Sequence, residues 1–360
     1  MSNPTQHQDV VDTYNGEEGP QPLLILDRIE AFLDVAGIGS GPLNWARIGE
    51  GQSNITYRIT RKDADLVLRR GPRPPLPRST HDMVRESRIQ TLLGNEGFPV
   101  PNIVASSTDE SILGVPFYIM DFLEGEVITG ESPKLLVTPE SKRHTSELMV
   151  DALVQLHSLD VSTGPLATLG KPDGYLKRQV DRFSALWDIN TLRSLPEVAE
   201  LGIWLGDNIP QTQRNSVIHG DYRMGNLMFT SSSDPEVLAV LDWEMATLGD
   251  PLADLGYLLA TYAERDEAPT VMELTPVTRE AGYYTRAEII ERYQAHMSLD
   301  LSALPWYQTL ALWKAAIFCE AIYTRWLKGE RPEDQNFSAT LKQGVPDLLA
   351  RARTFASQLA

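Results

Sequence analysis

The sequence predicts an α+β fold of two lobes, a small N-terminal lobe with an antiparallel sheet and a larger, mainly helical C-terminal lobe. Two features of the chain predict this division. Between residues 45 and 69, three short extended runs are separated by turns, the first of which contains glycine, a pattern typical of neighbouring antiparallel strands. Beyond residue 127, most long segments carry apolar residues three and four positions apart, which is the spacing of one helix face.

The small lobe is predicted to span residues 21–122, after a polar and acidic flexible arm at 1–20. Its first segment, 23–33, predicts a helix with one broad apolar face that ends near Gly37. A second helix is predicted at 83–93, where apolar residues recur at helical spacing. Strands are predicted at 46–48, 55–60, 66–69, 100–103 and 117–122.

The larger lobe is predicted at residues 127–360, joined to the first by a short polar hinge at 123–126. Two extended runs, 216–229 and 237–243, interrupt its helical pattern and differ in composition from their surroundings. Broad apolar stripes predict helices at 146–159, 175–195, 252–264, 286–297, 306–327 and 347–359.

Composition and charge exclude several classes of function. With 32 Lys and Arg against 49 Asp and Glu, the formal charge is −17, which argues against nucleic acid or an anionic membrane as partner. The longest apolar run, 255–263, is far shorter than the roughly 20 residues that span a membrane. The N-terminus lacks the features of a secretory signal, so a cytoplasmic enzyme is expected. The single cysteine, Cys319, lies in an apolar run and is expected to be buried.

Polar residues lie at the ends of the apolar strands in the two extended runs of the larger lobe. Asp221 follows an apolar strand, Asn226 comes five residues later, and Asp242 ends the next apolar run. Phosphoryl transfer to a hydroxyl needs an acceptor for the hydroxyl proton, and Asp221 is placed for that. Mg²⁺ prefers few, hard oxygen ligands, which Asn226 and Asp242 supply. Arg223 offers a cation for the charge that develops on the transferred group.

These residues resemble a known family. The run His219-Gly220-Asp221 with Asn226, then Asp242-Trp243-Glu244 and the run 249–255, is similar to the aminoglycoside phosphotransferase family. That family is a branch of the protein-kinase-like fold that phosphorylates small molecules, and the resemblance extends over about residues 44–327. Residues 66–72 and 321–329 resemble most the subgroup with the kinase-like domain of animal acyl-CoA dehydrogenase fusion proteins, which implies hydroxy acids or their thioesters as a substrate lead.

The resemblance implies a nucleotide site for ATP or GTP with Mg²⁺. Asp221 would be the catalytic base, assisted by Arg223, and the metal would be held by Asn226 and Asp242. A hairpin would cover the phosphates and a hinge at 120–123 would meet the adenine. The residues implied to bind the nucleotide are Gly49, Gly51, Ser53, Asn54, Arg69, Glu86, Asp121 and Leu123.

Arg69 departs from the usual pattern of the fold. The third strand normally presents a lysine paired with a carboxylate, and here the pair is Arg69 with Glu86. Arginine keeps the charge and binds phosphate or carboxylate with two nitrogens, but it is not a compact point charge. Arginine is usual here in the resembling subgroup, yet the substitution also motivates a second hypothesis, a nucleotide-binding pseudokinase without transfer activity.

Two other acceptors agree less well with the sequence than a small-molecule hydroxyl does. A protein kinase is disfavoured because no Ala-Pro-Glu segment follows Asp242. An aminoglycoside acceptor would suit the acidic chain electrostatically, but net charge says little about one pocket. The acceptor, the nucleotide preference and the oligomeric state are not determined by the sequence.

Several polar residues near the motif are expected to be structural. His219 should shape the loop and His157 should be a satisfied core histidine. Asp250 and Asp254 are expected to cap the helix that follows or to brace the loop, with Asp250 the closer of the two to the site. Glu244 either approaches a metal-bound water or the acceptor, or pairs with Arg223.

Overall fold

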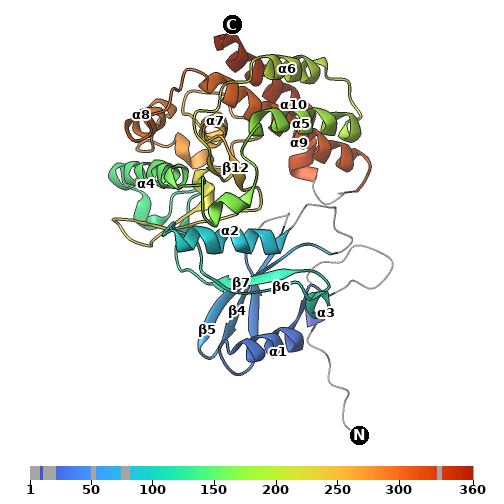
Figure 1. The fold of residues 1–360 in the computed structure, drawn as a ribbon, viewed down its shortest axis with the longest axis vertical. Coiled ribbons are helices and arrows are strands. Elements are labelled where there is room, and N and C mark those ends of the chain that lie inside the picture. Colours follow the sequence, from blue (N-terminus) through green and yellow to red (C-terminus); the bar gives the residue numbers. More distant parts are fainter. Residues whose placement is uncertain (1–8, 11–21, 50–53, 74–81, 331–334, 360) are drawn as a thin grey trace. The chain divides into compact units, whose positions relative to one another are not determined.

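The computed structural model describes residues 9–10, 22–49, 54–73, 82–330 and 335–359. The chain divides into two compact units, Met1–Glu124 and Gly125–Ala360. The first unit contains an antiparallel sheet, and the second is mainly helical, so the predicted fold class is confirmed (Figure 1).

The main sheet of the first unit has the strand order β3-β4-β5-β7-β6, and every neighbouring pair is antiparallel. Helices α1 (Leu26–Ala36) and α2 (Met83–Asn95) pack on it. The strands are β3 (Asn44–Arg47), β4 (Ile55–Arg61), β5 (Ala64–Arg70), β6 (Ile103–Ser107) and β7 (Phe117–Asp121). Smaller elements are β1 (Asp9–Val10), β2 (Leu24–Ile25) and α3 (Glu110–Leu113).

Alternation along β5 places the two helices on opposite faces of the sheet. Side chains of a strand point alternately to either face. Leu66 and Leu68 are buried in the cluster that contains the apolar face of α1. Arg69 points the other way and pairs with Glu86 of α2. The short β4–β5 turn fixes this register, so the sequence of β5 decides which side chain meets α2.

The second unit is built around α9, which packs against α5, α6, α7 and α10 (Figure 1). Trp306 and Trp313 of α9 are fully buried, and their indole nitrogens donate to backbone carbonyls of Leu205 and Val198. The helices are α4 (Pro139–Ser158), α5 (Tyr175–Asn190), α6 (Pro196–Asp207), α7 (Leu252–Thr261), α8 (Arg286–His296), α9 (Leu304–Leu327) and α10 (Gln335–Ala356).

Short strands of the second unit hold the predicted catalytic segments. Strand β9 (Ser216–Ile218) pairs with β12 (Thr247–Gly249). Strand β10 (Leu227–Phe229) lies between β8 (Glu126–Val127) and β11 (Val237–Val240). The extended patch predicted from the sequence is therefore two small sheets joined by the 219–226 loop.

Three predicted elements begin at other residues than expected. The strand predicted at 100–103 begins at Ile103 instead, because Pro101 lacks the N–H that a strand needs. Helix α4 begins at Pro139, seven residues before the predicted start, because Thr138 caps it by accepting from Ser141 N. Helix α10 begins at Gln335, twelve residues before the predicted start at residue 347, and contains Pro346.

Helix α6 was not predicted, and the predicted helix at 175–195 ends at Asn190. The α6 segment contains Gly202 and Gly206, which lower its helix propensity. Packing overrides that propensity, because a Cβ on Gly202 would lie 3.2 Å from the Trp313 ring. The glycine that weakens the helix signal is thus what lets α6 approach α9.

The contact between α7 and α9 depends on Gly256. A Cβ at this position would lie 2.5 Å from Tyr307 Cβ and 2.8 Å from its backbone carbonyl carbon. We expect Gly256→Ala to lower the free energy of unfolding by about 1–3 kcal/mol, because the helices must separate. Urea unfolding of the variant measures this. Gly206→Ala is the control, since nothing lies within 4 Å of its added Cβ, and it should not destabilise the chain.

Cys319 is buried, as predicted, on α9. Burial raises the pKa of its thiol to about 12. At pH 8 the native chain should therefore hold roughly three orders of magnitude less thiolate than an unfolded chain. We expect a thiol reagent to react with Cys319 only after denaturation. Rapid labelling of the native chain at pH 8 would contradict this burial.

Across the described helices, none has both the length and the apolar character needed to cross a membrane.

Candidate active site

The carboxylate of Asp221 accepts two side-chain hydrogen bonds and lies beside one cation, all from its own unit. Its Oδ2 accepts from Asn226 Nδ2 at 2.9 Å, and the same nitrogen donates to the Asp221 backbone carbonyl at 2.8 Å. Arg223 Nε lies 3.5 Å from Oδ2. The other carboxylate oxygen of Asp221, Oδ1, accepts from the hydroxyl of Tyr257 on α7. The geometry therefore fixes the rotamer of Asp221 and brings together three residues that the sequence analysis had singled out.

Asp254 braces the backbone that leads into Asp221. Its two carboxylate oxygens accept from the backbone N–H groups of His219, at 2.7 Å, and Gly220, at 2.8 Å. Asp254 is 1% exposed, so these bonds lie in a low-dielectric interior where they are strong. The structural role of Asp254 was predicted, but the prediction that Asp250 lies closer to the site than Asp254 was wrong. Asp250 accepts from Leu252 N at the start of α7 and from the Tyr307 hydroxyl, so Asp254 is the aspartate that contacts the loop.

The two histidines are structural, as expected. His219 Nδ1 accepts from Asp221 N at 3.2 Å, so Nε2 carries the proton and donates to Leu241 O at 2.9 Å. His157 is fully buried, with its ring nitrogens 2.9 Å from Tyr293 Oη and 3.4 Å from Asp254 Oδ2. Both histidines thus stabilise the loop around Asp221.

Asp242 has a backbone conformation that side chains rarely adopt. Its φ is +66°, which makes it the one non-glycine with positive φ among the residues described. The preceding residue, Leu241, donates from its N–H to the carbonyl of Asn226 at 2.8 Å, so the two candidate metal ligands belong to adjoining backbone segments. Strained backbone of this kind persists only where the surrounding structure holds it, and it concentrates at functional sites.

The donor set fits Mg²⁺ better than a transition metal. The described part of the chain contains no group of three or more His, Cys, Asp or Glu residues arranged to hold an ion. Asn226 uses its amide nitrogen to hold Asp221, which leaves its amide oxygen for a ligand. One amide oxygen and one carboxylate are the kind of sparse, hard donor set that Mg²⁺ takes together with water and phosphate oxygens.

The predicted nucleotide-binding residues belong to the first unit. Arg69 Nε lies 3.3 Å from Glu86 Oε1, and this carboxylate oxygen also accepts from Tyr118 at 3.0 Å. The ion pair expected from the sequence is therefore present. Gly49 has a φ of +75° and Asn54 is 5% exposed, whereas Gly51 and Ser53 lie outside the described residues.

Two further predicted nucleotide-binding residues lie at the end of β7 and just beyond it. Asp121 ends β7, where its N–H donates to Asn102 O at 3.0 Å. Leu123 comes two residues later, in an irregular segment.

Tyr257 is a site residue that the sequence analysis missed. It lies on α7, three residues after Asp254, so both occupy neighbouring positions on one helix face. Burial and the neighbouring Asp221 raise the pKa of the Tyr257 hydroxyl well above its ordinary value, so it keeps its proton and donates. The three-residue spacing from Asp254 was the signal that could have identified Tyr257 as a site residue. However, Tyr257 lies in an apolar run, which predicts core packing instead.

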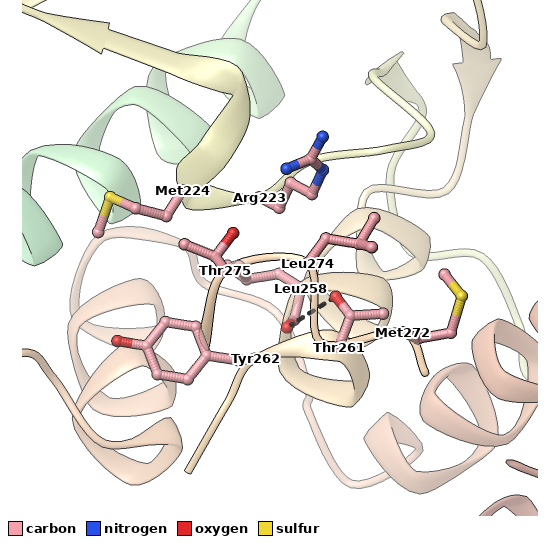
Figure 2. Close-up of a pocket in the computed structure, with 8 residues that line it drawn as sticks. All are labelled: Arg223, Met224, Leu258, Thr261, Tyr262, Met272, Leu274 and Thr275. Atoms are coloured by element: carbon pink, nitrogen blue, oxygen red, sulfur yellow. Dashed lines mark hydrogen bonds between the residues drawn. The ribbon is translucent and has the colours of Figure 1, made fainter. Parts of the chain in front are cut away.

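A pocket opens beside Arg223, between α7 and residues 272–275 (Figure 2). Its apolar walls include Leu258 and Met272, and Tyr262 closes one side. Thr275 is 7% exposed, and its Oγ1 has no hydrogen-bond partner within the described chain. The lining residues are Arg223, Met224, Leu258, Thr261, Tyr262, Met272, Leu274 and Thr275.

The model of the Phosphotransferase enzyme family (APH) matches residues 44–289, about two thirds of the chain. The chain belongs to this phosphotransferase family. The resemblance inferred from the motif around Asp221 is therefore confirmed.

Curated relatives narrow the position of the chain within this family. Acyl-CoA dehydrogenase family member 10 of Mus musculus is 34% identical over 88% of the chain, which covers 29% of that protein. Acyl-CoA dehydrogenase family member 11 of Homo sapiens is 29% identical over 94% of the chain, covering 45% of that protein. The chain spans less than half the length of these relatives. The predicted likeness to this subgroup is confirmed.

Solved structures share the fold of the chain. A protein from Ralstonia eutropha, provisionally named an aminoglycoside phosphotransferase, is 27% identical with a TM-score of 0.77, covering 92% of this chain and 98% of that one. Aminoglycoside phosphotransferase APH(4)-Ia, solved with AMP-PNP and hygromycin B, is 15% identical with a TM-score of 0.59, with the same coverage of both chains. At that identity the second likeness shows the fold alone.

Proposed function

We propose that this phosphotransferase moves the γ-phosphoryl group of ATP, or of GTP, to a hydroxyl of a small metabolite. The observation that carries the proposal is the Asp221 carboxylate, fixed by Asn226 and Tyr257 with Arg223 beside it. A carboxylate held in one rotamer, next to a cation and a metal-binding amide, suits the transfer of a phosphoryl group to an alcohol. Nucleotide complexes of structures with this fold support ATP as donor.

Each residue would have one task in the transfer. Asp221 orients the acceptor hydroxyl and takes its proton as the oxygen bonds to the γ-phosphorus and the bond to the nucleoside diphosphate breaks. Arg223 stabilises the charge on the transferred group. Mg²⁺, held by Asn226 and Asp242, would neutralise phosphate charge when bound. In the first unit, Arg69 would bind phosphate while Glu86 keeps it in place.

Hydroxy acids or their thioesters are the proposed acceptors. The likeness to acyl-CoA dehydrogenase family members 10 and 11 supports this class. An aminoglycoside is the competing acceptor, as in the complex of APH(4)-Ia with hygromycin B. Arg223 favours the acid, because a guanidinium beside the acceptor repels a polycation. Neither a nucleic acid nor a membrane is among the proposed partners.

An acceptor panel tests the proposal. The chain is incubated with MgATP and hydroxy acids, hydroxyacyl thioesters, aminoglycosides, choline or sugars, and mass spectrometry detects the gain of one phosphate. We expect a hydroxy acid or thioester to be phosphorylated and aminoglycosides not to be. Phosphorylation of aminoglycosides alone would overturn the acceptor class.

Arg69 supports one competing function, a nucleotide-binding protein without transfer activity. Its ion pair with Glu86 keeps the charge arrangement that the lysine normally provides, which favours the enzyme. We expect Arg69→Lys to retain nucleotide binding and to lower turnover, because a lysine cannot bind phosphate with two nitrogens. A wild-type chain that transfers nothing, with turnover gained in Arg69→Lys, would instead establish the pseudokinase.

A further inference from the structure

The pocket beside Arg223 has room for about one water molecule. Its volume is about 10 Å³, at the lower end of what an ordered internal water needs. Two polar atoms border one point in this region, the position that a Cβ on Gly225 would take. Beyond the neighbours of Gly225 in the chain, the heavy atoms nearest to this point are Arg223 Nη1 and, at 3.3 Å, Thr275 Oγ1. Figure 2 shows the Thr275 hydroxyl on the side of the pocket that faces Arg223.

Both of these residues carry a buried polar atom that the described chain leaves unpaired. Thr275 Oγ1 and Arg223 Nε have no hydrogen-bond partner among the described residues. Thr275 is only 7% exposed, so bulk solvent does not serve its hydroxyl. Buried polar groups are nearly always paired, and an internal water is the usual partner where the chain provides none.

The third polar side chain of the pocket favours a water over an anion. Thr261 also lines the pocket, and its hydroxyl already donates to Tyr257 O at 2.9 Å. Its oxygen therefore keeps only lone pairs, which repel an anion. A water suits a pocket that presents both kinds of group, because it accepts from the guanidinium and donates to a threonine oxygen.

Hydrogen bonds around the pocket hold Thr275 in place. The hydroxyl of Thr278 donates to the backbone carbonyls of Thr275 and Ala263, both at 3.0 Å. Four residues along the chain from Thr275, Arg279 donates to the Glu273 carboxylate. The segment that carries Thr275 is therefore tied to the residues that follow α7, and its hydroxyl has a fixed position from which to hold a water.

We infer that an internal water in this pocket bridges Thr275 Oγ1 to the guanidinium of Arg223, which makes Thr275 a positioning residue for the transfer. Arg223 Nε lies 3.5 Å from Asp221 Oδ2, and Nη1 faces the pocket. Among the described residues, no hydrogen bond holds this guanidinium. The water supplies the missing one. The positioning role rests on the proposed phosphotransferase function, whereas the water site does not.

The water matters to the reaction because Arg223 acts on charge that develops during transfer. A cation already oriented toward the transferred group stabilises the transition state without reorganising. Without the water, the guanidinium can turn among its rotamers, and part of that stabilisation is lost. Because the interaction is made in the transition state, kcat should fall while binding of the nucleotide is unaffected.

Crystal structures of four forms of the chain test the water site without turnover. Thr275→Val removes the hydroxyl and keeps the shape, and Thr275→Ser restores a hydroxyl. Thr324→Val is the matched control, because Thr324 is also buried with an unpaired Oγ1 in the described structure but does not line the pocket. A further wild-type crystal is soaked in bromide, whose anomalous signal distinguishes an anion from a water.

We expect an ordered water within about 3.2 Å of Thr275 Oγ1 and of an Arg223 nitrogen in wild type and Thr324→Val. Thr275→Ser should show the water at the same place, and Thr275→Val should lack it. No water in the wild-type pocket, or the same water retained in Thr275→Val, would overturn the assignment. A bromide peak in the pocket would replace the water site by an anion site.

Kinetics with a phosphorylated acceptor test the positioning role. We expect Thr275→Val to lower kcat about tenfold with the KM for ATP unchanged, and Thr275→Ser to recover most of the loss. A kcat for Thr275→Val equal to that of Thr324→Val, or an equal loss in Thr275→Ser, would refute this role. A water bound as described in a chain that transfers nothing would sink the proposed function and leave the water site standing.

Discussion

Asp221→Asn is expected to lower kcat by about 10²–10⁴-fold, because the amide cannot take the proton of the acceptor hydroxyl. The side chain keeps its size, and Asn226 and Tyr257 still surround it. Binding of MgATP should therefore persist in the variant. Steady-state kinetics with a phosphorylated acceptor, together with nucleotide titration, measure the two effects separately.

Asp181→Asn is the matched control for this substitution. Asp181 lies on the surface of α5, where it pairs with Lys177 one turn away. Such an exposed pair contributes little, so kcat should be unchanged. Full turnover by Asp221→Asn would show that Asp221 is not the proton acceptor, and loss of nucleotide binding in the same variant would point to damage of the fold.

Asp254→Ala is expected to lower the free energy of unfolding by about 3–5 kcal/mol. The alanine leaves the backbone N–H groups of His219 and Gly220 without their acceptor, and His157 loses its carboxylate. Turnover should fall with stability, because the same N–H groups position Asp221. Urea unfolding gives the stability, and hydrogen exchange of the two amides gives the local effect.

Asp300→Asn is the comparison for Asp254→Ala. Asp300 also accepts from a backbone N–H, that of Ser302, but in an exposed turn. Water replaces a lost bond there, so the change in stability should stay below about 1 kcal/mol. If Asp254→Ala unfolded at the wild-type midpoint and its two amides exchanged no faster, the bracing role would be wrong.

The sequence predicts the part of the candidate site that is local in the chain. Asp221, Arg223 and Asn226 lie within one loop of six residues, so their proximity follows from their spacing. Arg69 and Glu86 are farther apart, but strand alternation and the helix face after the strand bring them together. The fold class follows from the same periodicities, which persist over many residues.

The remainder of the site depends on tertiary contacts that periodicity does not reveal. Tyr257 meets Asp221 across 36 residues, and Thr275 meets the space over Gly225 across 50. Each is a single polar residue in a segment whose other residues indicate core or loop. Helix α6 was missed for a similar reason, since Gly202 weakens its propensity while packing on Trp313 stabilises it.

The central claim is transfer of a phosphoryl group to an acceptor, as opposed to nucleotide binding or hydrolysis. The most direct test follows ATP labelled with ¹⁸O in the γ-phosphoryl group and compares the labelled acceptor with the ADP formed. We predict one labelled phosphorylated acceptor for each ADP, and at least about 10²-fold slower formation of both products with Asp221→Asn. ADP formed with the label only in inorganic phosphate, for every hydroxyl compound tried, would contradict the account.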